Sequence, residues 1–279
     1  MSKWAVATKD GLVELGGGAE TGRAILVGHT PPMSIGYEVR ERIAYISFDR
    51  VEKHNALRDS DLAALVEALH RLDGDESADV AIVFGKGRSF SSGGDVADRL
   101  QASMNEGSIA GRTTEGPAFV ECQNWKPVIA AVHGYCLGHA LGTALHCDMI
   151  VADRRAKFQV TEILVGLPMA GLLPLLGTPG FATDVVMTGR FFTAEEAWQG
   201  GMVARLVDEG RHIEGAEELA RQLLEVPQGA LRTTVRARRL VRQRLSAPYQ
   251  EVVGEFSWAQ SEEARQAVTS RAAKRGGDR

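Results

Sequence analysis

The chain has 279 residues, 44% of them hydrophobic and 24% charged, which is the composition of a globular protein and excludes collagen, a coiled coil and general disorder. A formal charge of −4 provides no basic field for nucleic acid or an anionic membrane, so a small-molecule ligand is expected. The three cysteines lack metal-site spacing, and no apolar run is long enough to span a bilayer or to form a signal-peptide core, which favours a cytoplasmic protein without a bound metal.

The first half of the chain predicts strands and one clear helix. Residues 1–34, rich in glycine and proline, predict an extension with little regular structure. Alternating apolar and polar residues in 37–48 predict a strand pair. In 59–72, apolar residues recur at helical spacing behind Asp59 or Ser60, either of which can cap a helix.

Short apolar runs at 80–84, 128–132 and 149–152 predict strands buried on both faces of a parallel sheet. A helix is predicted over 138–146, between the last two runs. Strands that alternate with helices indicate an α/β fold, which we divide into a core over 35–205 and a helical region over 206–279.

Beyond Gly189 the pattern predicts helices. Thr193 and Glu196 form a capping box, 214–224 is amphipathic, and a last helix is expected over 261–274. Between these lie six arginines, Arg232, Arg236, Arg238, Arg239, Arg242 and Arg244. Because they interleave with apolar residues at helical spacing, we expect a solvated or interface-facing charged side and not a nucleic-acid site.

Three segments combine glycine and polar residues directly after or near buried strands, where α/β proteins place ligands. Residues 85–95 form a glycine-rich turn, and 126–142 run from a strand through a turn into a helix N-terminus, whose N–H groups favour developing negative charge. In 158–168, Glu162 is a lone carboxylate among apolar residues and is a candidate for proton transfer. Taken singly, a structural turn, an ordinary strand–helix connection and a cap or salt bridge explain the three segments equally well.

Taken together, these segments resemble the crotonase (enoyl-CoA hydratase/isomerase) family over about residues 37–275. The matching stretches are 46–57 with Arg50 and Asn55, Phe90-Ser-Ser-Gly-Gly-Asp95, 126–152, 162–171, 188–203 and 261–265. The resemblance implies a crotonase-type spiral of ββα units with a helical C-terminal trimerisation region. It also implies an acyl-CoA thioester as substrate, no separate cofactor, and a homotrimer or dimer of trimers.

The resemblance assigns roles by position. Two backbone N–H groups, those of Gly94 and His139, are expected to hold the thioester oxygen, and Glu162 to act as acid and base. Such preorganised donors stabilise the charge that proton removal pushes onto that oxygen. Contacts to the coenzyme A arm or substrate are expected from Lys53, Ala56, Leu57, Gly93, Asp95, Val96 and Gly138.

The chain departs from the family pattern at Gly142, where hydratases generally carry a second glutamate. One carboxylate suffices for a 1,3 proton shift, so isomerisation competes with a noncanonical hydration. His146, one helical turn on, is a candidate substitute acid or base, although a core histidine is the simpler interpretation. Two alternatives remain open: an acyl-CoA binder with a retired site, and a hydrolase or decarboxylase that uses a histidine.

Overall fold

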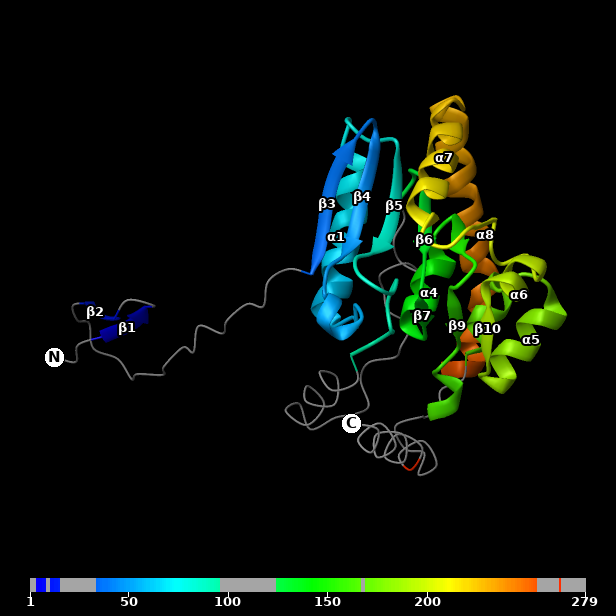
Figure 1. Ribbon diagram of the computed structural model, residues 1–279, viewed down its shortest axis with the longest axis horizontal. Helices are drawn as coiled ribbons and strands as arrows, with labels where there is room; N and C mark the ends of the chain where they lie inside the picture. Colours follow the sequence, from blue (N-terminus) through cyan, green and yellow to red (C-terminus); the bar gives the residue numbers. More distant parts are fainter. Residues whose placement is uncertain are drawn as a thin grey trace. The chain divides into compact units, whose positions relative to one another are not determined.

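The computed structural model describes residues 4–8, 11–15, 34–95, 124–166, 169–254 and 266 (Figure 1). The chain divides into two units, Met1–Pro32 and Met33–Arg279. Val96 and most of the helix predicted over 261–274 lie outside the described residues.

The first unit contains a hairpin of β1 (Trp4–Thr8) and β2 (Gly11–Leu15). The antiparallel register pairs Trp4 with Leu15 and Val6 with Val13. Such apolar cross-strand pairs stabilise two-stranded pairing. The prediction of little regular structure in residues 1–34 is based on Gly16–Gly18 and on Thr30-Pro31-Pro32, which lie outside these two strands in the sequence.

The second unit is built on a six-stranded sheet in the order β11-β8-β6-β5-β4-β3. The first two strands in sequence, β3 (Ile35–Arg40) and β4 (Ile43–Phe48), form the expected antiparallel pair. The strands β5 (Val80–Gly85), β6 (Val128–Val132) and β8 (Met149–Asp153) continue the sheet in parallel, at the three predicted apolar runs.

A second sheet of three short strands has the order β10-β9-β7. It contains β7 (Tyr135–Leu137), β9 (Lys157–Gln159) and β10 (Phe191–Thr193). β6 and β8 of the large sheet are each followed by a small-sheet strand, β7 and β9, and then by a helical segment. This is the ββα succession that the resemblance implies, and it carries the chain from one sheet to the other twice.

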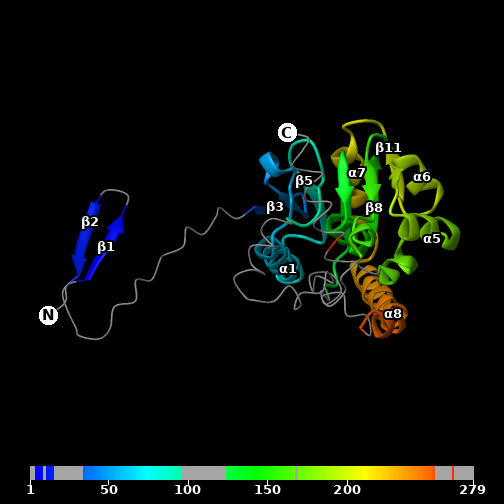
Figure 2. The same cartoon turned by 90° about the horizontal axis from the view of Figure 1, so that it is seen from below.

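Helices cover both faces of the large sheet, as Figure 2 shows for α1 (Asp59–Gly74) and α7 (His212–Leu224). Alternate residues of the strands enter two separate apolar clusters: Ala81 and Val83 face the cluster that contains α1, whereas Val80 and Ile82 face α7. Burial on both faces explains why these strands are continuous apolar runs.

The α1 start corrects one detail of the sequence analysis. The residue before the helix is Arg58, and its N–H donates to Asp61 Oδ2 at 2.8 Å, so neither Asp59 nor Ser60 is the cap. By contrast, the capping box of α6 (Ala194–Gln199) is confirmed, with Glu196 N–H donating to Thr193 Oγ1 at 3.2 Å.

The region beyond Gly189 also contains strands that the helical pattern did not predict, β10 and β11 (Arg205–Val207). The remaining elements are the 3-10 helices η1 (Val51–Lys53), η2 (Ile163–Val165) and η3 (Ala170–Leu175) and the α-helices α4 (His139–His146), α5 (Pro179–Thr188) and α8 (Gln228–Gly254). In the described part of the chain, no helix is both long enough and apolar enough to cross a membrane.

The arginines of α8 face the protein more than the sequence pattern predicts. Arg238 and Arg239 donate to the carboxylate of Asp148, which is only 6% exposed, and Arg242 donates to the carbonyl oxygens of His146 and Cys147. The interleaved Leu240, Val241 and Leu245 are about half exposed. Of the two predicted alternatives, a solvated or an interface-facing charged side, the solvated one does not hold for Arg239, which is buried, or for Arg242, which bonds inward.

Candidate active site

Glu162 lies immediately before η2, just beyond the end of β9, and only 8% of its surface is exposed. The Thr161 hydroxyl donates to its Oε2 at 3.3 Å. A Cβ added to Gly138 would lie 3.0 Å from Glu162 Oε1 and 2.3 Å from Thr161 Oγ1. The carboxylate therefore packs directly on the backbone of the turn before α4.

Gly93 and Gly94 pass close to the same turn. Gly93 has φ +95°, which favours glycine, and a Cβ added there would lie 2.6 Å from Leu137 O and 3.7 Å from His139 N. The backbone of the first glycine-rich segment is thus brought within van der Waals range of the second. Only a residue without a side chain permits this approach.

A parallel bridge to Leu57 orients the Gly94 peptide. Leu57 N–H donates to Gly93 O at 2.8 Å, and Asp95 N–H donates to Leu57 O at 2.8 Å. In a parallel pair the residue between these two partners directs its own N–H to the opposite side. The Gly94 N–H therefore points away from Leu57.

His139 is the first residue of α4, after Gly138 with φ +52°. The N–H groups of a first helical turn point outward along the axis, since they have no intrahelical acceptor. Gly138 N–H donates to Gln159 O at 2.9 Å, which fixes the turn to the end of β9 and so to Glu162. Two backbone segments with donors, those of Gly94 and His139, thus adjoin one buried carboxylate.

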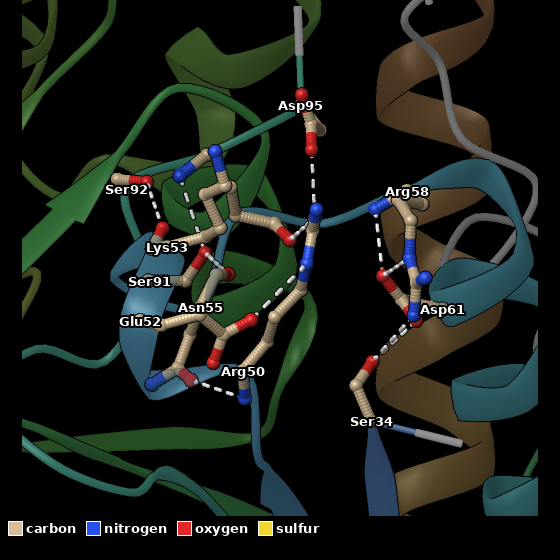
Figure 3. A network of polar contacts seen from close by, with 12 residues as sticks. Ser34, Arg50, Glu52, Lys53, Asn55, Arg58, Asp61, Ser91, Ser92 and Asp95 are labelled. Carbon is tan, nitrogen blue, oxygen red and sulfur yellow. Dashed lines mark hydrogen bonds and ion pairs between the residues drawn. The ribbon is translucent and has the colours of Figure 1, made fainter. Parts of the chain in front are cut away.

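A polar network holds the Leu57–Gly94 bridge in place (Figure 3). Arg50 Nη1 donates to Ala56 O at 3.0 Å and to Asp95 Oδ2 at 2.7 Å. Asn55, 1% exposed, donates to Ser89 O and accepts from Arg50 N–H, both at 2.9 Å. The Asp95 side chain thus ties the loop to Arg50, a role that the sequence analysis did not assign.

The structure separates the remaining predicted binding residues into two groups. Ala56, Leu57, Gly93, Asp95 and Gly138 lie in or next to the bridge and the turn. Lys53 lies at the end of η1 and is exposed, so its ammonium is available to an anion in solution. The resemblance includes Arg50 and Asn55 without assigning them a role. In the structure the backbone of His54 and Asn55 is left-handed, a conformation that asparagine tolerates.

Gly142 faces open space: no described atom lies within 4 Å of a Cβ placed there. His146 Nδ1 lies 2.7 Å from Gly142 O, and because a carbonyl only accepts, Nδ1 carries the proton. Burial, followed by nearby arginines of α8, lowers the pKa of His146 to about 4. A neutral ring bonded back to its own helix supports the core interpretation of this histidine.

His133 has a structural contact as well. Its Nε2 lies 3.0 Å from Gly87 O, and its ring stacks on His212 at 4.0 Å between centroids. Burial lowers the pKa of His212 to about 4. Within the described residues, no group of three or more histidine, cysteine or acidic side chains is placed to hold a metal ion.

A family model described as enoyl-CoA hydratase/isomerase matches residues 38–271. An (E)-benzylidenesuccinyl-CoA hydratase of Thauera aromatica is 31% identical over 211 residues, which are 74% of this chain and 82% of the relative. A carnitinyl-CoA dehydratase of Salmonella arizonae is 36% identical and covers 66% of this chain and 71% of its own.

Solved structures share the fold. The crystal structure of an enoyl-CoA hydratase/isomerase from Pseudoalteromonas atlantica superposes with a TM-score of 0.73 at 26% identity, covering 86% of this chain and 97% of its own. The crystal structure of an enoyl-CoA hydratase from Mycobacterium tuberculosis gives a TM-score of 0.66 at 29% identity and covers 87% of this chain and 96% of its own.

Proposed function

This chain belongs to the enoyl-CoA hydratase/isomerase family and has the crotonase fold, and from that premise we propose that it acts on an enoyl-CoA thioester through an enolate, with Glu162 as the proton-transfer group. The observation that carries the proposal is the meeting of three segments at one point. Gly93 approaches the Leu137–His139 turn, and Gly138 of that turn contacts the Glu162 carboxylate.

The two backbone donors account for enolate stabilisation. Removal of a proton from Cα of a thioester moves negative charge onto the carbonyl oxygen. The N–H groups of Gly94 and His139 donate hydrogen bonds to that oxygen and stabilise the charge. Donors fixed by tertiary structure need no reorganisation during the reaction and are each worth about 3–4 kcal/mol in comparable sites. Their side chains take no part, which explains how a histidine is tolerated at position 139.

Glu162 alone is sufficient for a double-bond shift. Its carboxylate takes a proton from Cα of a 3-enoyl-CoA, electrons move to the carbonyl oxygen, and the same proton is returned at Cγ as the 2-enoyl-CoA forms. No atom is gained or lost, and one group acts as base and then as acid. Glycine at position 142 leaves no second carboxylate at that helix position, which favours this reaction.

Hydration is the second candidate, because the similar curated proteins include (E)-benzylidenesuccinyl-CoA hydratase and 2,3-dehydroadipyl-CoA hydratase. In that reaction water adds at Cβ, its proton passes to Glu162, and the proton then reaches Cα. A Cβ placed on Gly142 would have no described atom within 4 Å, so there is open space beside this residue. A water molecule there would need polar partners.

The test compares wild type with Glu162→Gln on 2-enoyl-CoA and 3-enoyl-CoA substrates of short and medium length. We expect turnover to fall about 10²–10⁴-fold, because glutamine keeps the shape but cannot accept a proton. Glu67→Gln, on the exposed face of α1, is the matched control and should retain full activity. Equal turnover by wild type and Glu162→Gln would overturn the assignment.

Product analysis separates the candidate reactions. A shifted double bond indicates isomerisation, and a 3-hydroxyacyl-CoA indicates hydration. Release of free CoA or carbon dioxide would identify the hydrolase or decarboxylase alternative. Acyl-CoA binding in calorimetry without turnover of any substrate would instead identify a binding protein.

A further inference from the structure

The side chain next to the proposed acid/base group is Thr161, and its hydroxyl is turned toward the Glu162 carboxylate. Thr161 Oγ1 donates to Glu162 Oε2 at 3.3 Å. Thr161 is half-buried and Glu162 is buried, so this hydrogen bond lies largely out of bulk water. A hydrogen bond donated to a carboxylate in such a setting favours its ionised form.

The surrounding backbone fixes both side chains in this arrangement. Leu164 N–H donates to Thr161 O at 3.2 Å, and Val165 N–H donates to Glu162 O at 3.0 Å, so the first turn of η2 holds both residues. On the other side, Gly138 leaves the hydroxyl just enough room, since a Cβ there would overlap Thr161 Oγ1 at 2.3 Å. A glycine, a hydroxyl and a carboxylate therefore pack in contact.

We propose that Thr161 is a positioning residue for Glu162: its hydroxyl orients the carboxylate toward the Gly138–His139 turn and keeps it ionised for proton abstraction. The proposal rests on the proposed role of Glu162 and adds a residue that acts through it. With Oε2 bonded to Thr161, Oε1 is the carboxylate oxygen nearer to the position of a Gly138 Cβ.

The test replaces the hydroxyl without changing the shape, in Thr161→Val, and retains it in Thr161→Ser. Thr161→Ala serves as a second hydroxyl-free variant if valine impairs folding. Thr234→Val is the control, because Thr234 is exposed on α8 and its hydroxyl donates to Ala230 O of the same helix at 2.9 Å. Folding of each variant is checked by circular dichroism.

The primary readout needs no substrate: a ¹³C NMR titration of the Glu162 side-chain carboxyl in protein labelled at glutamate Cδ, with the resonance assigned by its loss in Glu162→Gln. We expect the midpoint to rise by about 0.5–1 pH unit in Thr161→Val and Thr161→Ala. Thr161→Ser and Thr234→Val should keep the wild-type midpoint. The acidic limb of the kcat/KM profile should move in parallel.

An unchanged midpoint in a folded hydroxyl-free variant overturns the proposal, as does an equal shift in Thr161→Ser. Because the titration is independent of turnover, its result stands apart from the fate of the proposed function. Active Glu162→Gln would refute the catalytic role of Glu162, whereas an unmoved titration would refute only the role of Thr161.

Discussion

At the scale of single residues, the site depends on glycines that allow backbone segments to touch. Gly93 and Gly138 both have positive φ, and each would place a Cβ against backbone or a functional side chain. The glycine-rich motifs were visible in the sequence, where they were interpreted as places at which backbone can approach a ligand; the contact between the two segments is seen only in the structure. The contact of Thr161 with Gly138 was not predictable, because it depends on the path of β9 beside the turn.

Gly138→Ala should reduce kcat/KM by at least about tenfold, because the added methyl group overlaps Thr161 Oγ1 at 2.3 Å and approaches Glu162 Oε1 at 3.0 Å. Displacement of a catalytic group by about an ångström costs roughly 10²-fold in comparable sites. The strain of a non-glycine residue at φ +52° adds to the effect. Steady-state kinetics on the 2-enoyl-CoA or 3-enoyl-CoA substrate that wild type turns over measure the loss.

The matched control is Gly180→Ala, on the exposed first turn of α5. A Cβ there meets no described atom within 4 Å, and alanine in a helix is favoured over glycine by up to about 1 kcal/mol. This variant should therefore be slightly more stable than wild type in urea unfolding. Equal damage from both substitutions would contradict the steric explanation for Gly138.

At the scale of elements, ion pairs as well as apolar contacts hold α8 against the rest of the second unit. Asp148 accepts from Val128 N–H, Arg238 and Arg239 at 2.9, 2.9 and 3.0 Å, and Asp79 is paired with Arg232 at 2.7 Å. Two buried acids on the large-sheet side thus hold two separate turns of the helix. This arrangement fixes the rotation of α8 about its axis.

Asp148→Asn should lower the free energy of unfolding by about 3 kcal/mol, because it leaves Arg239, 10% exposed, without its compensating charge. Urea denaturation of wild type and variant measures the difference. Asp184→Asn removes the exposed pair with Arg190 and should cost less than about 1 kcal/mol. Similar losses in the two variants would argue against a structural role for the buried pair.

The elements found from sequence and those missed differ in length and in the range of their contacts. Long periodic segments such as Asp59–Gly74 and continuous apolar runs such as Val80–Gly85 were identified correctly. Strands of three residues, such as β7 and β9, are too short to show alternation. The inward orientation of the α8 arginines depends on Asp148, ninety residues away from Arg238, which no local pattern reveals.

At the scale of the whole molecule, two histidines make folding sensitive to acid. Burial lowers the pKa of both His146 and His212 to about 4, below the ordinary value of 6.5. Between these values the unfolded chain binds protons that the folded chain does not. The neutral rings therefore make their full contribution to the free energy of unfolding above about pH 6.5, and this contribution is lost as the pH falls toward 4.

The free energy of unfolding should fall as pH drops from 6.5 to 4.5, with each histidine contributing at most about 1.4 kcal/mol per pH unit. His212→Phe retains the stacked ring against His133 and should flatten the slope. His70→Gln, on the exposed side of α1, should leave it unchanged. Urea titrations at half-unit pH intervals measure the slopes, and identical slopes for wild type and His212→Phe would refute this explanation.

The reliance on backbone donors at Gly94 and His139 has an evolutionary consequence. The groups proposed to stabilise the enolate belong to every amino acid except proline, so the anion site does not depend on the chemical identity of the side chain that carries each donor. Under the proposed mechanism, substitutions at positions 142, 161 and 162 change proton transfer while the backbone donors are retained. A descendant of such a chain can then change its reaction by replacing a few side chains, without first rebuilding the backbone groups proposed to hold the thioester oxygen.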